Sequence, residues 1–278
     1  MIRYLAEGVK HAFGLHRPGR ILPVLPDDIL LASYPQSECT SLQFLLANLF
    51  HPDREVNFDN LRHVVLDPDV STKRDFDRSP RPRIMNTRSG FDARYRRVIY
   101  LVRDPRDVAQ SRYETLRKLR KIDDQLSIAD FIDRFLAGKD VQERSSQDDS
   151  GSWGENVGSW MAVRSSHPGF LWLRYEDLVA DAERELKRVA DFLGLPTDPK
   201  KISQAIERSS LVPLVNERNE LPEAQVASIE EAWGDIMACL GYKLTTRDPG
   251  DALKSSLIAL LMSDGRAARP VPGNGNRP

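Results

Sequence analysis

Two segments of this chain place polar and charged side chains directly after short apolar runs. In residues 28–41 the apolar run leads into Tyr34-Pro-Gln-Ser-Glu-Cys-Thr-Ser41, and in residues 97–111 it ends at Arg103 and continues to Ser111. A strand, a polar loop and a helix in this order direct backbone N–H groups and the positive end of a helix dipole toward a phosphate. Two such units in one sheet predict a nucleotide with phosphates at two places.

The two segments resemble the motifs of the sulfotransferase superfamily, which transfers the sulfuryl group of 3′-phosphoadenosine 5′-phosphosulfate. Arg103-Asp-Pro-Arg-Asp-Val-Ala-Gln-Ser111 matches the family pattern Arg-x-Pro-x-Asp-x-x-x-Ser at every fixed position. Residues 153–160 and 173–178 are similar to later landmarks of the family and follow in its usual order. The resemblance covers roughly residues 28–243. It implies an α/β, P-loop-like three-layer fold, with a central, mainly parallel sheet and helices on both faces.

The resemblance also implies which residues bind the co-substrate, 3′-phosphoadenosine 5′-phosphosulfate. Arg103 and Ser111 correspond to the residues that hold the 3′-phosphate of the nucleotide, and a planar guanidinium suits bidentate contact with a phosphate. The residues expected on the 5′ side are Gln36, Ser37, Thr40 and Ser41. The alternative for Arg103 is an ion pair with Asp104 or Asp107 at a helix N-terminus.

The loop expected around the 5′ group departs from the family pattern at three positions. Gln36 stands where the family has a lysine or arginine, Glu38 replaces a glycine, and Ser41 replaces a tryptophan. Two like charges about 4 Å apart repel by about 4 kcal/mol at an effective dielectric constant of 20. Losing a group that stabilises developing charge lowers a rate by about 10²–10³. Glu38 is either a solvated loop carboxylate or, alternatively, a base that acts on the acceptor.

The acceptor side departs from the family pattern as well. Asn86-Thr87-Arg88 follows a predicted strand where the family has Lys-Thr/Ser-His, and an arginine does not release its proton at ordinary pH. We expect Arg88 to face the acceptor, bind an anionic acceptor or replace the missing loop cation; an exposed surface arginine is the alternative. Asn156 stands where animal cytosolic members often have histidine. No Arg-Lys-Gly-x-x-Gly clamp is visible, and Arg218 is the only cation within residues 211–219.

Composition excludes several other classes of function. The 278 residues carry 40 basic and 41 acidic side chains, so no net field attracts nucleic acid or an anionic membrane. Cys39 and Cys239 provide no disulfide or metal framework, and we expect no metal. No apolar stretch is long enough to span a membrane, and no secretory signal is evident. These features predict a cytoplasmic protein, and the resemblance implies a small-molecule acceptor. They leave a homodimer or a partner protein open.

Apolar periodicity predicts strands that alternate with helices, which is typical of a parallel sheet covered on both faces. The predicted strands are residues 29–33, 83–87, 98–102 and 170–173. The predicted helices are residues 41–50, 106–121, 181–194 and 222–240. Residues 138–154 are predicted to form a mobile loop. We expect an N-terminal extension over 1–27, a sulfotransferase-like domain over 28–243, and a C-terminal extension over 244–278 whose composition predicts a disordered end.

Two functions follow from these observations. The first is a sulfotransferase that moves a sulfuryl group to a hydroxyl or amine of a small molecule by in-line displacement, without a covalent enzyme intermediate. The alternative is a sulfotransferase-fold protein that has lost or changed its activity. Such a protein would serve as a nucleotide-binding or partner subunit, or as an enzyme of different chemistry in the same cleft. The alternative rests on Gln36, Glu38, the missing histidine and the missing clamp.

Overall fold

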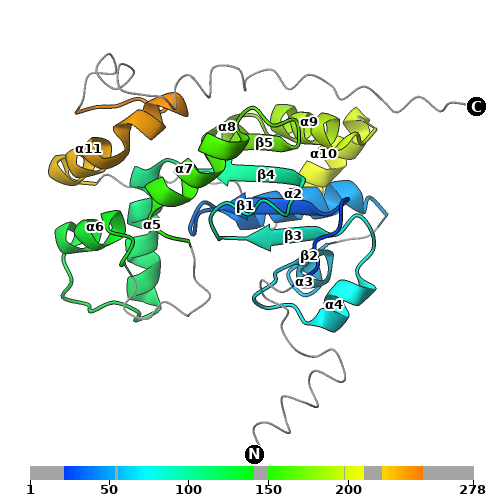
Figure 1. The fold of residues 1–278 in the computed structure, drawn as a ribbon, viewed down its shortest axis with the longest axis horizontal. Helices are drawn as coiled ribbons and strands as arrows, with labels where there is room; N and C mark the ends of the chain where they lie inside the picture. The colour runs from blue at the N-terminus through cyan, green and yellow to red at the C-terminus, as the bar shows by residue number, and fades with distance from the viewer. Residues whose placement is uncertain (1–21, 54–55, 141–149, 197, 210–220, 247–278) are drawn as a thin grey trace, which may run out of the picture.

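A single parallel sheet organises the molecule (Figure 1). The structure is a computed structural model that describes residues 22–53, 56–140, 150–196, 198–209 and 221–246. Its five strands lie in the order β2-β3-β1-β4-β5, and all of their pairings are parallel. The strands are β1 (Ile29–Ser33), β2 (Val65–Leu66), β3 (Ile84–Thr87), β4 (Arg97–Val102) and β5 (Phe170–Arg174).

Helices cover both faces of this sheet and divide the core in two. One core contains side chains of α4 (Lys73–Arg78), α5 (Pro105–Lys118), α6 (Ile128–Leu136), α7 (Trp153–Arg164) and α11 (Glu223–Cys239). The other contains side chains of α2 (Cys39–Phe50), α3 (Leu61–Val64), α8 (Tyr175–Ala180), α9 (Ala182–Leu193) and α10 (Pro199–Arg208). None of the helices in the described ranges is long and apolar enough to cross a membrane.

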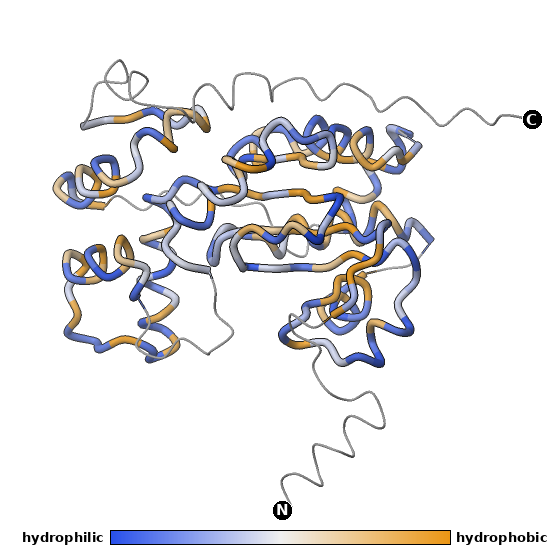
Figure 2. Tube along the Cα trace, viewed as in Figure 1, coloured by the Kyte–Doolittle hydropathy of each residue, from blue (hydrophilic) through white to orange (hydrophobic). Residues whose placement is uncertain are grey.

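The central strands are apolar along their length because both of their faces are buried (Figure 2). In β1, Leu30 and Ala32 belong to the first core, whereas Ile29 and Leu31 belong to the second. Successive side chains of a strand point to opposite faces, so each residue of β1 must suit a helical layer. The predicted three-layer α/β fold with a central parallel sheet is confirmed.

The helix boundaries differ from the predicted ones where the backbone turns without a glycine. Helix α2 begins at Cys39 instead of residue 41, because Glu38 adopts a left-handed conformation directly before it. Helix α5 ends at Lys118 instead of residue 121. There Arg120 has φ 52°, its N–H donates to the carbonyl of Arg117, and the N–H of Lys121 donates to that of Leu116. This pair of bonds terminates helices, usually with glycine at the left-handed position.

Several short elements were not predicted from the sequence. They are β2, α3, α4, α6, α8 and α10. The sequence does contain an N-cap residue for helix α6. This residue is Ser127, whose side chain accepts a hydrogen bond from the N–H of Asp130. Helix α7 begins at Trp153, inside the segment predicted to be a loop, with Ser152 and Glu155 forming a capping box. Residues 141–149 of that segment, the N-terminal residues 1–21 and the tail from 247 lie outside the described residues.

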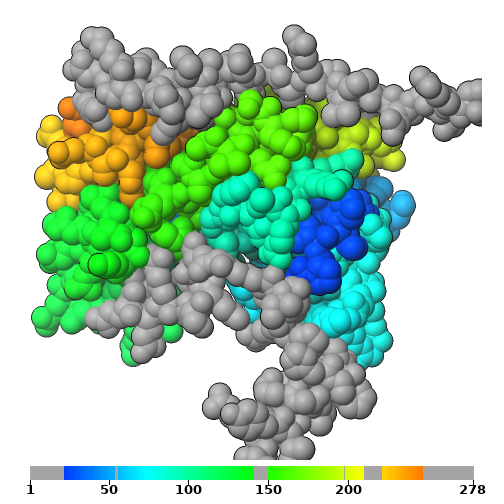
Figure 3. Space-filling view, in the orientation of Figure 1, coloured from blue at the N-terminus to red at the C-terminus, as the bar shows by residue number. Residues whose placement is uncertain are grey.

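Helix α7 packs closely on α11, which adjoins α6 on one side of the molecule (Figure 3). Trp153 and Trp160 are fully buried in the core. The rings of Trp153 and Trp233 lie 5.4 Å apart between centroids. At Gly154 a Cβ atom would lie 2.4 Å from Nε1 of Trp233, so only glycine fits this contact.

We predict that Gly154→Ala destabilises the fold by about 1–3 kcal/mol, because the added methyl group must displace the Trp233 indole. Gly158→Ala is the matched control one turn along the same helix, since its Cβ would meet only Cδ1 of Ile236 at 3.8 Å. We expect this control to raise stability by up to about 1 kcal/mol through helix propensity. Urea unfolding of the three proteins measures both effects. Equal stabilities for the two variants would contradict the described packing.

Candidate functional site

The register of the central strands brings the two predicted phosphate-binding segments together. Strands β1 and β4 are neighbours, with Ala32 opposite Tyr100 and Ser33 opposite Leu101. The loop after β1 and Arg103 after β4 therefore leave the sheet at the same edge. In open parallel sheets, ligands bind outside the carboxyl ends of the strands, and particularly between neighbouring loops of this kind.

The loop after β1 has a backbone shape that favours glycine but contains none. Its N–H of Ser37 donates to the carbonyl of Tyr34 over 3.2 Å, which closes a turn. Gln36 has φ 67°, and Glu38 has φ 57° and ψ 35°, so both lie in the left-handed region. For residues with a Cβ this region costs about 1–2 kcal/mol each. The loop thus combines a tight, left-handed backbone with residues that carry side chains.

The start of α2 presents free polar groups beside this loop. No side chain caps α2, and the N–H of Ser41 in its first turn donates to the carbonyl of Glu38 over 3.2 Å. The hydroxyls of Ser37 and Ser41 are 1% and 2% exposed, and neither has a hydrogen-bond partner among the described residues. Buried polar groups are nearly always paired in a native protein. Two unpaired hydroxyls next to a helix N-terminus fit the oxygens of a bound phosphate.

Arg103 contacts this loop directly. Its side chain is 6% exposed, and its Nη1 donates to the carbonyl of Gln36 and to Oε1 of Glu38, each over 3.3 Å. Its guanidinium lies over the ring of Tyr175, 5.1 Å from the centroid. The partner of Arg103 is therefore Glu38, which the sequence did not indicate. The expected alternative partner, Asp104, pairs with Arg106 over 2.6 Å.

The remaining predicted binding residues, Thr40 and Ser111, lie outside the contact between Arg103 and the loop after β1. Thr40 is exposed in the first turn of α2, and Ser111 is half-buried on α5. No hydrogen bond joins Ser111 to Arg103 within the described part of the chain. The predicted position of the missing clamp, with Arg218, lies outside the described residues.

The end of β3, where the sequence predicts the acceptor side, holds an ion pair. Arg88 is 55% exposed, and its Nη1 lies 3.5 Å from Oδ2 of Asp67, which follows β2. Asn156 is buried; it accepts a hydrogen bond from the hydroxyl of Tyr100 and donates to the carbonyls of Arg88 and Ser150. Asn156 therefore fixes the backbone that carries Arg88. Neither residue provides a proton acceptor for an incoming hydroxyl.

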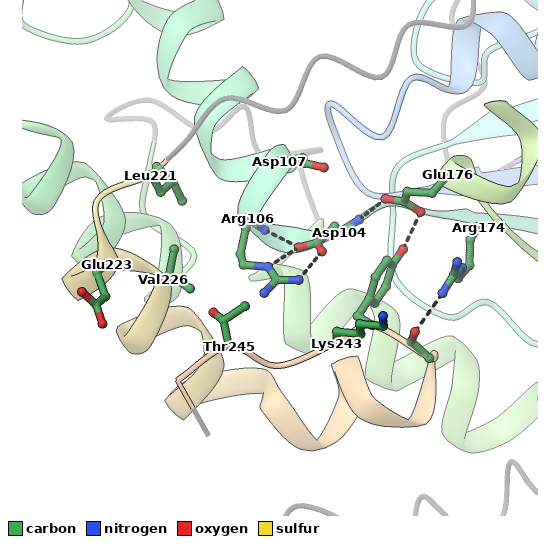
Figure 4. A pocket seen from close by; sticks show the side chains of 12 residues that line it. Asp104, Arg106, Asp107, Arg174, Glu176, Leu221, Glu223, Val226, Lys243 and Thr245 are labelled. Carbon is green, nitrogen blue, oxygen red and sulfur yellow. Dashed lines mark hydrogen bonds and ion pairs between the residues drawn. The ribbon is translucent and has the colours of Figure 1, made fainter. Parts of the chain in front are cut away.

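A cavity of about 750 Å³ lies beside the ends of β4 and β5 (Figure 4). Its lining includes Asp104, Arg106, Glu176 and Tyr242 but neither Arg103 nor the loop after β1. Burial raises the pKa of the Glu176 carboxyl above its usual value. Burial also raises the pKa of Tyr242, so its hydroxyl stays protonated and donates to Glu176 over 3.0 Å. The cavity borders the candidate site without being part of it.

Comparison with known proteins identifies the family. The model of the sulfotransferase domain matches residues 26–221. The chain belongs to the sulfotransferase domain family. It is 27% identical over 227 residues to sulfotransferase 1A1 of Bos taurus, covering 76% of this chain and 71% of that protein. It is 27% identical over 207 residues to sulfotransferase 2A2 of Rattus norvegicus, covering 70% and 69% of the two chains.

Solved structures of sulfotransferases share the fold. Mouse sulfotransferase SULT7A1, complexed with PAP, superposes with a TM-score of 0.59 and 19% identity, over 81% of this chain and 89% of that one. A putative steroid sulphotransferase of Arabidopsis thaliana superposes with a TM-score of 0.60 and 22% identity, over 81% of each chain. The predicted sulfotransferase resemblance is confirmed.

We predict that the left-handed loop reverses the usual preference between alanine and glycine. Gln36→Gly should be more stable than Gln36→Ala by about 1 kcal/mol, because only glycine adopts φ 67° without strain. At the exposed position Lys187 in α9, Lys187→Gly should instead be less stable than Lys187→Ala by about 1 kcal/mol. Urea unfolding of the four variants tests the prediction. The same order at both positions would rule out the described loop conformation.

Proposed function

We propose that this chain transfers a sulfuryl group from 3′-phosphoadenosine 5′-phosphosulfate to a hydroxyl or amine of a small-molecule acceptor. One observation supports this above all others. The chain is a member of the sulfotransferase domain family. Its buried Arg103 contacts the loop before α2, where the hydroxyls of Ser37 and Ser41 are buried and unpaired among the described residues. A guanidinium and such a loop are complementary to the two phosphate groups of this nucleotide.

Each proposed binding residue has a role that its position supports. Ser37, Thr40 and Ser41, with the N–H groups at the start of α2, would hold the 5′ side. Arg103 and Ser111 would hold the 3′-phosphate. Gln36 would contribute through its left-handed backbone rather than through a charge. Because family clamp residues are not visible in the sequence, Arg103 carries more of the binding than a single cation usually does.

The reaction requires the acceptor to lose a proton and the nucleotide to gain charge. The acceptor oxygen or nitrogen attacks the sulfur, and the bond between the sulfur and the bridging oxygen breaks. The product 3′-phosphoadenosine 5′-phosphate then leaves. Arg88 is the cation that we place on the acceptor side, and its pairing with Asp67 suits electrostatic orientation of an acceptor. An arginine cannot take the acceptor's proton, so the chain suits acceptors that ionise readily.

Glu38 gives this site an internal competitor for the nucleotide. Its carboxylate accepts a hydrogen bond from the guanidinium of Arg103, as a phosphate oxygen would. It is 38% exposed, so it can turn to solvent when a phosphate binds. Nucleotide binding therefore replaces one anion at Arg103 with another, and the affinity is lower than for an unoccupied guanidinium.

The setting of the activity follows from composition. We place the protein in the cytoplasm, because its two cysteines suit a reducing compartment and its balanced charge gives no attraction to anionic surfaces. We assign the activity to a domain over residues 28–243. The described residues Ile229, Met237 and Tyr242 of that range share a core with the central strands, which supports the assignment.

We predict that Arg103→Ala weakens binding of 3′-phosphoadenosine 5′-phosphate by about tenfold to a hundredfold, the equivalent of about 1.5–3 kcal/mol for a lost charged partner. Arg117→Ala is the matched control, since it removes the same charge from the exposed end of α5. Calorimetric titration measures both. Clear binding by the parent with unchanged affinity in Arg103→Ala would sink the assignment of this residue.

We predict that Gln36→Lys combined with Glu38→Gly raises nucleotide affinity by about tenfold or more, equivalent to about 1.4 kcal/mol. The change adds a cation beside the 5′ group, frees Arg103 and allows the backbone to approach the phosphate. The gain should depend only modestly on salt, because charges enclosed in a loop are poorly screened. Glu38→Gln alone separates the charge from the backbone effect. Unchanged affinity in the double variant would favour a different ligand in this cleft.

Turnover with simple phenols and alcohols should be absent or slow, because Arg88 cannot act as a general base and Gln36 supplies no cation. Sulfuryl transfer is measured by the mass shift of the product across a panel of neutral and readily ionised acceptors. A rate near about 10 s⁻¹ with a simple phenol would show that other residues supply both missing groups. A panel that yields no product from any acceptor, with tight nucleotide binding, would contradict catalysis.

A further inference from the structure

The peptide unit that joins Arg103 to Asp104 is held on both sides. Its carbonyl oxygen accepts a hydrogen bond from Nε1 of Trp153 over 3.2 Å. Its N–H donates to Oε1 of Glu176 over 2.8 Å. The two groups of one peptide point in opposite directions, so an indole from α7 and a carboxylate from α8 fix its orientation. This peptide is the junction between β4 and α5, and it sets the direction in which the Arg103 side chain leaves the backbone.

Glu176 is itself held in place by a segment far along the chain. Its second oxygen, Oε2, accepts a hydrogen bond from the hydroxyl of Tyr242 over 3.0 Å (Figure 4). The neighbouring Arg174 donates to the carbonyl of Gly241 over 3.0 Å and lies over the Tyr242 ring. Both oxygens of the Glu176 carboxylate are thus used, one toward Arg103 and one toward the residues that follow α11.

The residue next to Glu176 completes the arrangement. The guanidinium of Arg103 packs on the ring of Tyr175, with its central carbon 5.1 Å from the ring centroid. The first two residues of α8 therefore position both ends of Arg103, with Tyr175 at the guanidinium and Glu176 at the backbone. The next carboxylate, Asp177, makes no hydrogen bond to Arg103 or to its peptide among the described residues. It pairs with Arg174 over 2.9 Å at a more exposed position.

We propose that Glu176 is a positioning residue of the nucleotide site, which holds Arg103 in its binding orientation and links that orientation to Tyr242. The proposal rests on the proposed function, because it assigns a phosphate to Arg103. Glu176 touches no ligand itself. Glu176 lines the neighbouring cavity together with Asp104. Its removal would let water reach the N–H of Asp104, from which its carboxylate now accepts a hydrogen bond. The consequence is a loosened Arg103 rather than an unfolded protein.

The test compares five variants with the parent in calorimetric titrations with 3′-phosphoadenosine 5′-phosphate. Glu176→Ala should weaken binding by about fivefold to thirtyfold, the size of a lost hydrogen bond to a charged group. Glu176→Gln should restore most of the affinity, because its amide oxygen still accepts from Asp104 and its amide nitrogen can donate to the Tyr242 oxygen. Tyr242→Phe should give a smaller loss than Glu176→Ala, and the double variant should be no weaker than Glu176→Ala. Asp177→Ala is the control and should bind as the parent does.

Rescue by glutamine separates positioning from a general loss of stability, and an unfolding curve for each variant confirms that the titrated protein is folded. Parent-like affinity in folded Glu176→Ala, or equal losses in the alanine and glutamine variants, would overturn the positioning role. If the parent binds and Arg103→Ala does not, while Glu176→Ala binds normally, only this inference fails. If the parent does not bind the nucleotide at all, the proposed function fails and this inference fails with it.

Discussion

The parallel pairing of β1 with β4 is the constraint on which the rest of the site depends. It brings two loops, which are distant in the sequence, to one edge of the sheet, and it places the guanidinium of Arg103 beside the start of α2. A shift of the register by one residue would turn every side chain of β1 to the opposite helical layer. Because both layers are apolar and buried, the core fixes the register, and the register fixes the site.

Within that frame, the pair of Glu38 and Arg103 links the loop after β1 to the end of β4 electrostatically. A buried guanidinium without a partner costs several kcal/mol, so an arginine held there for a ligand needs another anion when the ligand is absent. Glu38 supplies that anion from a backbone position that favours glycine. The departure of the loop from its family pattern therefore has a structural role as well as a chemical cost.

The sequence predicted the parts of the fold that depend on apolar periodicity. The four longer strands and the helices α2, α5, α9 and α11 were predicted, because a buried parallel strand is a continuous apolar run and these helices carry an apolar face. The two residues of β2 are too few to carry a pattern, and the end of α5 depends on a left-handed arginine that no sequence rule indicates. The pairing of Arg103 with Glu38 was not predicted, because an ion pair between two loops depends on the strand order. The hydrogen bonds from Trp153 and Glu176 to the Arg103–Asp104 peptide were not predicted for the same reason.

The buried hydroxyls of Ser37 and Ser41 have a consequence for how this sequence can change over time. A hydroxyl buried without a partner lowers the stability of the empty protein, by about 1–3 kcal/mol for each group. Alanine at either position would remove that cost. At Ser41, which lies in α2, alanine would also favour the helix. Selection for a stable fold alone would therefore replace both serines. Under the proposed function, the oxygens of the bound nucleotide would be the partners that offset this cost and keep both serines.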